Sequence, residues 1–245
     1  MSKVIAVLSG KGGVGKSTLS VGLGLAFAKE GKKTLIIEMD FGLRGIDIML
    51  GISDRIVYDM GDLLEGRCTI SSAIIDSPRD GNLAAIAAPV EMERPMDYNE
   101  VKFIVSGLRN YFDIILLDMP AGLFPGVDLA ASIADEALIV TVPDPVSIRD
   151  GSKTVQLLRR KGFTNCRLVV NRLTRKVFRK KIIRYIDEII DGVGAKLIGV
   201  VPEDKKADIF SPTVSLMKED DLIFQECRDI AKRLGGVYVP LTIRI

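Results

Sequence analysis

The chain has 245 residues and a formal net charge of +2, so it is long enough for one sizeable α/β domain and has no overall charge bias toward nucleic acid or acidic lipid. It has no histidine, and its three cysteines are far apart without a CxxC pair, which argues against histidine chemistry, disulfides and a cysteine-built metal site. No apolar run is long enough to span a bilayer or to act as a signal peptide, so we expect a cytoplasmic protein.

Short apolar runs alternate with amphipathic segments along the chain. The apolar runs predict strands, and most are apolar at every position, as in a parallel sheet covered on both faces: Val4–Leu8, Thr34–Ile37, Leu83–Ala88, Ile114–Leu117, Ala137–Val142, Leu168–Val170 and Leu197–Val201. The segments between them predict helices, several of which end at a glycine: Thr18–Glu30, Asn99–Leu108, Val146–Lys161, Val177–Ile190 and Asp221–Leu234. This alternation predicts one α/β domain over residues 1–245, with a doubly wound, mainly parallel sheet flanked by helices.

The segment GKGGVGKST lies between the first predicted strand and the first predicted helix. Glycines let a backbone bend closely around phosphate oxygens, and the start of a helix adds N–H groups and its positive dipole end. We therefore predict a P-loop that binds nucleotide phosphates through Gly10, Lys11, Gly12, Gly13, Val14, Gly15, Lys16, Ser17 and Thr18. In this loop Lys16 reaches the β- and γ-phosphates, Ser17 is a Mg²⁺ ligand, and Thr18 serves the α-phosphate. The alternative is a glycine turn with accidental spacing.

Lys11 is a second lysine in this loop. The pattern KGGxGK[ST] resembles the deviant Walker A loop of the MinD/ParA/Mrp family of P-loop ATPases. The resemblance implies a homodimer that encloses ATP, in which Lys11 reaches the partner's phosphates and supplies charge to the transition state as an arginine finger does. Lys11 and Lys16 would then both be catalytic. The alternative for Lys11 is a solvated loop lysine.

Two carboxylates complete the site that this resemblance implies. The segment EMDFGLRGIDIMLG resembles the family's switch I, in which Asp40 matches the catalytic aspartate that polarises the attacking water and helps to organise Mg²⁺. Glu38 stands where the family has aspartate, which keeps the charge and shifts its hydrogen bonds. For Arg44 and Asp47, a functional role and a solvated loop charge stay equally open.

The second carboxylate is Asp118, which ends an apolar strand and begins DMPAG, a segment that resembles switch II. The resemblance implies that Asp118 holds a Mg²⁺-bound water and that the loop containing Gly122 resets on hydrolysis. Met119 stands where the family has a hydroxyl residue. The predicted metal ligands are thus Ser17, Asp40 and Asp118, and the alternative for Asp118 is an ordinary turn residue.

Two later strand ends are candidates for the base side of the site. Asn171 and Arg172 follow one predicted strand, and Pro202 and Glu203 follow the next. In the family such positions enclose adenine, and an asparagine amide suits adenine's donor and acceptor edge. The chain has no NKxD guanine motif, which favours ATP over GTP. Ordinary strand-end turns are the alternative.

The segments GLRGIDIMLG and RIVYDMGDLLEG resemble the MinD branch more than the ParA or Mrp branches. That branch implies an ATPase of bacterial division-site placement that dimerises with ATP, binds membrane and works with regulators resembling MinC and MinE. A ParA-like or flagellar-number positioning ATPase that binds DNA or a protein partner is the alternative. An Mrp-type iron–sulfur carrier needs cysteines near switch II, and residues 119–134 contain none. The segment SIRDGSK, with Arg149 and Asp150, resembles the start of the helix that lines the dimer surface, although a solvated helix start explains it as well.

The segment RLTRKVFRKKIIRY is strongly basic. As part of a helix over Val177–Ile190 it would place Ile182, Ile186 and Ile189 in an apolar stripe and these cations mostly elsewhere: Arg179, Lys180, Lys181 and Arg184. A solvated face, anionic lipid and DNA all stay open as explanations.

The C-terminal segment VYVPLTIRI differs from the amphipathic membrane helix that ends the MinD branch. It lacks that helix's basic face, and Pro240 interrupts it. We therefore expect only weak, salt-sensitive contact with the inner face of the cell membrane, made by the basic segment.

Overall fold

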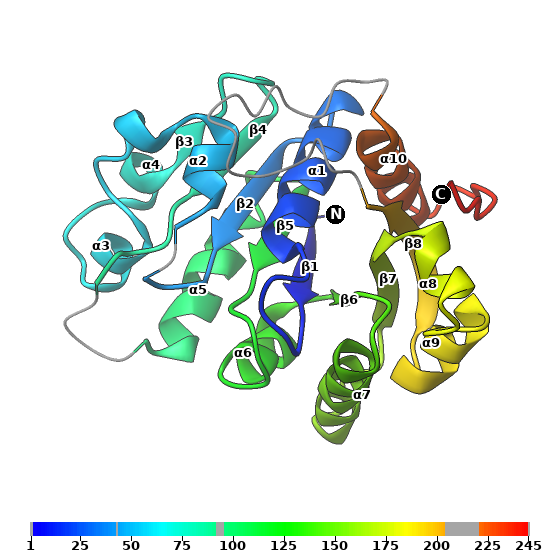
Figure 1. Cartoon of the computed structure of the whole chain (residues 1–245). Helices are drawn as coiled ribbons and strands as arrows, with labels where there is room; N and C mark the ends of the chain where they lie inside the picture. The colour runs from blue at the N-terminus through cyan, green and yellow to red at the C-terminus, as the bar shows by residue number, and fades with distance from the viewer. Residues whose placement is uncertain (1, 43, 92–95, 204–220, 245) are drawn as a thin grey trace.

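In the computed structural model, which describes residues 2–42, 44–91, 96–203 and 221–244, helices cover both faces of an eight-stranded sheet (Figure 1). The strand order is β3-β4-β2-β5-β1-β6-β7-β8, and neighbours run parallel except β3 and β4. The strands are β1 Lys3–Leu8, β2 Thr34–Glu38, β3 Ile75–Asp76, β4 Leu83–Ile86, β5 Ile114–Asp118, β6 Glu136–Thr141, β7 Cys166–Leu173 and β8 Lys196–Pro202. The doubly wound sheet confirms the predicted fold class, and every predicted strand is present; the short antiparallel β3 escaped prediction.

Alternation along β1 shows why its residues are apolar throughout. Val4, Ala6 and Leu8 enter one hydrophobic core, whereas Ile5 and Val7 enter the other. Successive side chains of a strand point to opposite faces, so a strand covered on both sides needs apolar residues at each position.

The helices form the two outer layers. They are α1 Lys16–Lys29, α2 Ile46–Leu50, α3 Met60–Leu64, α4 Ile70–Ala73, α5 Tyr98–Leu108, α6 Gly126–Ile133, α7 Pro145–Arg160, α8 Arg175–Arg179, α9 Ile186–Val193 and α10 Leu222–Leu234, with a short 3₁₀ turn at Ser53–Arg55. Buried residues of α1, α2 and α10 belong to the core on one face, and those of α5, α6, α7 and α9 to the core on the other. None of the described helices is long and apolar enough to cross a bilayer.

The predicted helix over Val177–Ile190 is wrong. The chain forms two short helices, α8 and α9, and Lys181 between them has a left-handed φ of 54°. Ile182, which the predicted stripe would bury, is 48 % exposed, and its neighbour Ile183 is 4 % exposed and packs into the core. The chain therefore bends near Lys181 so that Ile183 is buried, and a continuous helix with the predicted apolar stripe would not bury this residue.

The order of the central strands places the site. Strand β1 lies between β5 and β6, and the chain winds outward from it in both directions (Figure 1). In such sheets the carboxyl ends of the strands at this reversal form a crevice in which ligands bind. The turn from β1 to α1, which is the predicted P-loop, lies at this position.

Candidate active site

The P-loop connects β1 to α1 and depends on its glycines for shape. Gly13 and Gly15 have left-handed φ values of 74° and 89°, which favour glycine. A Cβ added to Gly10 would lie 2.6 to 2.8 Å from atoms of Asp150, so the loop passes directly against the backbone of α7. Asp150, predicted only from its resemblance to a partner-facing helix, thus packs beneath the loop. No side chain caps α1 in the described structure, so its first N–H groups stay available to an anion.

The C-terminal end of the loop is buried and holds a polar network. Lys16 is 6 % exposed, and Asp118 at the end of β5 is fully buried. Ser17 Oγ donates to Asp118 Oδ2 at 2.6 Å, and Ser20 Oγ donates to Asp118 Oδ1 at 2.8 Å. Burial raises the pKa of Asp118, while the Lys16 charge and the two hydroxyls act in the opposite direction. The predicted pair of Ser17 and Asp118 is therefore brought into direct contact.

Thr18 fits a polar ligand. Its Oγ1 is buried and has no hydrogen-bond partner in the described structure. A buried hydroxyl without a partner costs free energy, which a phosphate oxygen at the loop would offset. The contact of Thr18 with the α-phosphate stays a prediction, and its buried hydroxyl has the hydrogen-bonding capacity that this contact needs.

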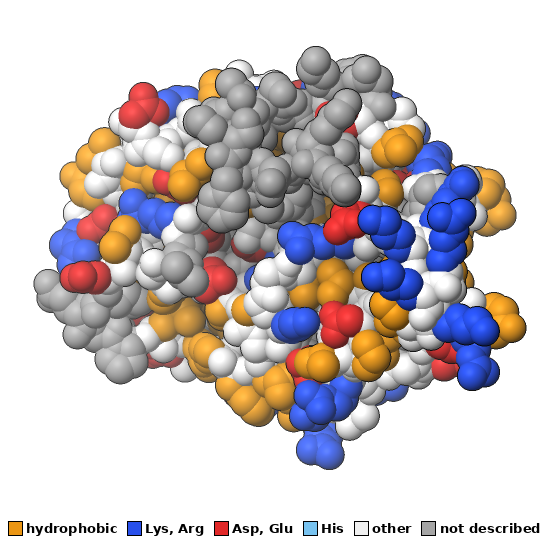
Figure 2. All heavy atoms as spheres, viewed as in Figure 1, with side chains coloured by type: hydrophobic (Ala, Val, Ile, Leu, Met, Phe, Trp, Pro, Cys, Tyr) orange, Lys and Arg blue, Asp and Glu red, His pale blue; other side chains and the backbone are white. Residues whose placement is uncertain are grey.

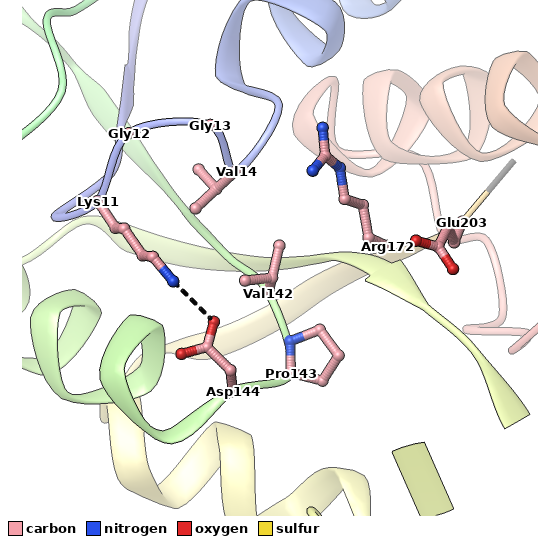
Figure 3. Close-up of a pocket in the computed structure, with 9 residues that line it drawn as sticks. All are labelled: Lys11, Gly12, Gly13, Val14, Val142, Pro143, Asp144, Arg172 and Glu203. Carbon is pink, nitrogen blue, oxygen red and sulfur yellow. Dashed lines mark hydrogen bonds and ion pairs between the residues drawn. The ribbon is translucent and has the colours of Figure 1, made fainter. Parts of the chain in front are cut away.

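The N-terminal end of the loop has a different environment. The Lys11 side chain is 46 % exposed, and its Nζ lies 3.4 Å from Oδ2 of Asp144. Asp144 also caps α7, because its Oδ1 accepts from the N–H groups of Val146 and Ser147 at 3.0 Å each. Within one chain, then, Lys11 points toward Asp144 and is paired with a helix cap (Figure 3).

Glu38 connects switch I to the sheet. Its Oε1 accepts from Gly45 N at 2.7 Å and Ile46 N at 3.1 Å, and its Oε2 accepts from Ala88 N at 3.4 Å. Burial raises the pKa of Glu38 to about 7, against the effect of these N–H groups. The carboxylate of Glu38, where the family has aspartate, thus joins the start of α2 to the residues that follow β4.

The remaining residues of the two switch segments differ in position: one lies near the site, and the others support the surrounding structure. Asp40 follows β2, is partly exposed, and its charge contributes to the raised pKa of Asp118, which places the two carboxylates near each other. Arg44 is not a solvated loop charge, because it donates to Ala88 O at 2.6 Å and pairs with Asp59. Asp47 is 6 % exposed on α2, and Met119 is a fully buried core residue. A solvated role for Arg44 and Asp47 is therefore excluded.

A cavity of about 260 Å³ joins the loop to the ends of later strands (Figure 3). Its lining is Lys11, Gly12, Gly13, Val14, Val142, Pro143, Asp144, Arg172 and Glu203. The cavity thus joins the first part of the predicted phosphate loop to Arg172 and Glu203 of the predicted base side, whereas Lys16, Ser17, Thr18 and Asn171 are not among its lining residues. Pro202 is buried at the end of β8 and pairs with Leu173 of β7.

The comparisons with known proteins agree with this arrangement. The ParA family model, described as the NUBPL iron-transfer P-loop NTPase, matches residues 1–181. The septum site-determining protein MinD of Synechocystis is 35% identical and aligns with 98% of this chain and 92% of its own length. MinD of Bacillus subtilis is 34% identical, with 99% and 92% covered. The chain belongs to the MinD family of ParA-type P-loop ATPases.

Solved MinD structures share the whole fold. The chain in a MinC:MinD complex from Aquifex aeolicus has a TM-score of 0.88 and 37% identity, with 99% of both chains covered. MinD from Pyrococcus horikoshii, determined with Mg-ADP, has a TM-score of 0.82 and 25% identity, with 96% of both chains covered. This MinD-family chain is thus an ATPase of division-site placement that binds nucleotide and Mg²⁺.

Sequence inspection missed two residues of the MinD-type site, Asp144 and Ser20. A signal for Asp144 was present, because aspartate followed by proline is a typical helix start and here follows β6, the neighbour of β1. Ser20 lies one helical turn after Lys16 and so faces the same side of α1. Its spacing gave no indication that it would contact Asp118.

Proposed function

We propose that the chain is an ATP-dependent dimerisation switch, in which two copies enclose two ATP molecules and each Lys11 acts on its partner's nucleotide. The contrast between the two lysines supports this role. Lys16 is buried beside Asp118, as a lysine of the chain's own site should be, whereas Lys11 is half exposed and paired with Asp144. Breaking the exposed ion pair of Lys11 costs little free energy, so this lysine at the open rim of the cavity can instead contact the nucleotide of a second molecule.

Within one protomer, Lys16 binds the β- and γ-phosphates and Thr18 contacts the α-phosphate. Bound Mg²⁺ neutralises phosphate charge, and Ser17, Asp40 and Asp118 would hold it directly or through water. The contact of Ser17 Oγ with Asp118 at 2.6 Å supports this donor set. Asp40 orients the attacking water, and Arg172, Pro202 and Glu203 enclose the adenine.

The test is the dependence of ATP hydrolysis on protein concentration with Mg²⁺ present. If each site needs Lys11 from a partner, the rate should be slow and should rise more than linearly with concentration, because turnover follows the dimer population. Rates strictly proportional to concentration across the range in which the chain dimerises would contradict the proposal.

The protein partner is proposed to resemble MinC. Support comes from the Aquifex aeolicus MinC:MinD complex, whose MinD chain shares 37% identity and the full fold with this chain. A regulator resembling MinE is proposed to stimulate hydrolysis. A pull-down with and without a non-hydrolysable ATP analogue tests both, and capture of a MinC-like protein independent of nucleotide would contradict a switch.

A weak contact with anionic membrane is proposed for Arg179, Lys180, Lys181 and Arg184. All of them are exposed, and the exposed Ile182 and Tyr185 lie among them, which favours lipid headgroups over nucleic acid phosphates. Figure 2 shows Lys and Arg side chains gathered along the right edge, over α8 and the segment that follows it. Binding to anionic vesicles should be weak and should vanish with added salt. Binding to duplex DNA but not to such vesicles would instead indicate nucleic acid.

A further inference from the structure

Asn171 contacts the P-loop itself. Its Nδ2 donates to the carbonyl oxygen of Val14 at 2.7 Å, and its Oδ1 accepts from the N–H of Arg172 at 2.9 Å. The residue is 8 % exposed, at the end of β7, 157 residues from Val14. One donor and the acceptor of the amide are thus already used within the protein, although the sequence predicts this amide as an adenine contact.

A distortion of β7 aims the amide at the loop. The pairing of β7 with β8 shifts register between Val170 and Leu173, and Arg172 there has a left-handed φ of 55°. Such bulges redirect side chains at strand ends, and a left-handed φ at arginine costs free energy that surrounding contacts must offset. The hydrogen bond from Arg172 N to Asn171 Oδ1 is one such contact, and it fixes the orientation of the amide.

The contact also determines where the next peptide N–H points. The Val14 carbonyl and the Gly15 N–H belong to one planar trans peptide, so they point in opposite directions. Because the carbonyl faces Asn171, the Gly15 N–H faces away from the Asn171 amide. The packing is close: a Cβ on Gly15 would lie 2.4 Å from Asn171 Nδ2.

We propose that Asn171 is a positioning residue that fixes the Val14–Gly15 peptide so that its N–H donates to bound phosphate. This rests on the proposed function only in taking the loop as the phosphate site. In this proposal Asn171, on strand β7, does not recognise the base but holds the phosphate loop in the conformation that binds phosphate. Asn171 then acts on every phosphorylated ligand equally, whatever base the ligand carries.

The experiment compares MgADP with the magnesium complex of ribose 5′-diphosphate, which has no base, by calorimetric titration of the full chain. The variant Asn171→Asp keeps the acceptor for Arg172 N–H and the side-chain shape but has no donor for the Val14 carbonyl. Loss of one such hydrogen bond should weaken both ligands by the same factor, about tenfold. The matched control is Asn165→Asp, since the Asn165 amide also donates to a carbonyl, Asp135 O at 2.8 Å, away from the loop. That control should leave both affinities unchanged.

An effect on MgADP with ribose 5′-diphosphate unchanged would overturn the proposal and assign Asn171 to the base, and no effect on either ligand would overturn it as well. Asn171→Ala should give the same equal loss, because it removes the donor without the charge by which a carboxylate at this position would itself repel phosphate. Thermal unfolding without ligand checks that both variants are folded at the temperature of the titration. These ligands carry no γ-phosphate, so failure of ATP to dimerise the chain would contradict the proposed function and leave this comparison intact.

Discussion

The two ends of the P-loop differ in burial and in partner. At one end Lys16 is 6 % exposed and shares a hydrogen-bonded region with the buried Asp118. At the other end the Lys11 side chain is 46 % exposed and meets Asp144 at 3.4 Å. A buried cation beside a buried carboxylate is fixed in place, whereas an exposed ion pair is worth about 0 to 1 kcal/mol and exchanges partners readily. One loop therefore combines a buried lysine that is fixed in place with an exposed lysine whose ion pair exchanges readily.

The largest effect is expected at the buried end. Lys16→Ala removes a direct phosphate charge and leaves Asp118 buried without its cation, so MgATP affinity should fall by at least about a hundredfold. Calorimetric titration measures this, with Lys29→Ala, at the far end of α1, as the control. If Lys16→Ala kept near-parental affinity for MgATP, the buried and exposed ends of the loop would not differ in the way proposed.

The raised pKa of Glu38 predicts that the free energy of unfolding depends on pH. The folded pKa of Glu38, about 7, is above its ordinary 4.5, so its contribution to the free energy of unfolding is complete below about pH 4.5 and is lost as pH rises through 7. Between pH 5 and pH 8 the parent should lose up to about 3 kcal/mol more stability than Glu38→Gln. Urea unfolding at both pH values tests this, with the exposed Glu30→Gln as the control, and parallel curves for parent and Glu38→Gln would contradict it.

At the exposed end, Lys11→Ala should separate binding from assembly. Nucleotide affinity of the monomer should change by no more than about twofold, because Lys11 is paired with Asp144 and not with the buried network. ATP-induced dimerisation, measured by sedimentation, should weaken by about thirtyfold through the loss of a charged contact across the dimer. Equal losses of binding and dimerisation in both the Lys11 and the Lys16 variants would show that the two ends do not differ.

The smallest effect is expected from the partner of Lys11. Asp144→Asn keeps a capping oxygen for Val146 and Ser147 and removes the charge that holds Lys11. Dimerisation with ATP should strengthen by about two- to threefold, the size of an exposed ion pair. Weaker dimerisation, with α7 intact by circular dichroism, would indicate that Asp144 serves the assembled dimer.

Features that depend on one short stretch of the chain could be predicted from the sequence. The P-loop is one continuous segment, and the strands are apolar runs that need no partner to be recognised, so both were evident. Asp118 was also evident, because it ends such a run. The contacts that distinguish the two ends were not, since Lys11 meets Asp144 across 133 residues of chain.

The wrong helix prediction and the unforeseen contact of Asn171 have the same physical origin. The basic segment has helical periodicity, yet burial of Ile183 and the left-handed backbone at Lys181 divide it into α8 and α9. The adenine contact of Asn171 stays a prediction, and the structure adds what the sequence could not indicate, a hydrogen bond from its amide to the Val14 carbonyl next to a bulge in β7. Tertiary packing decides both, and a single sequence does not display it.

The central claim, that Lys11 acts on the partner's nucleotide, is tested most directly by mixing two inactive variants. Lys11→Ala keeps a complete site but supplies no lysine, and Asp40→Ala supplies Lys11 but cannot align water; each alone should hydrolyse ATP at least about a hundredfold more slowly than the parent. At protein concentrations that saturate dimerisation of both variants, half of the twofold dimers in an equimolar mixture are mixed and contain one complete site, so activity should return to about one quarter of the parental rate. A mixture no faster than the average of its two components would show that Lys11 acts within its own chain.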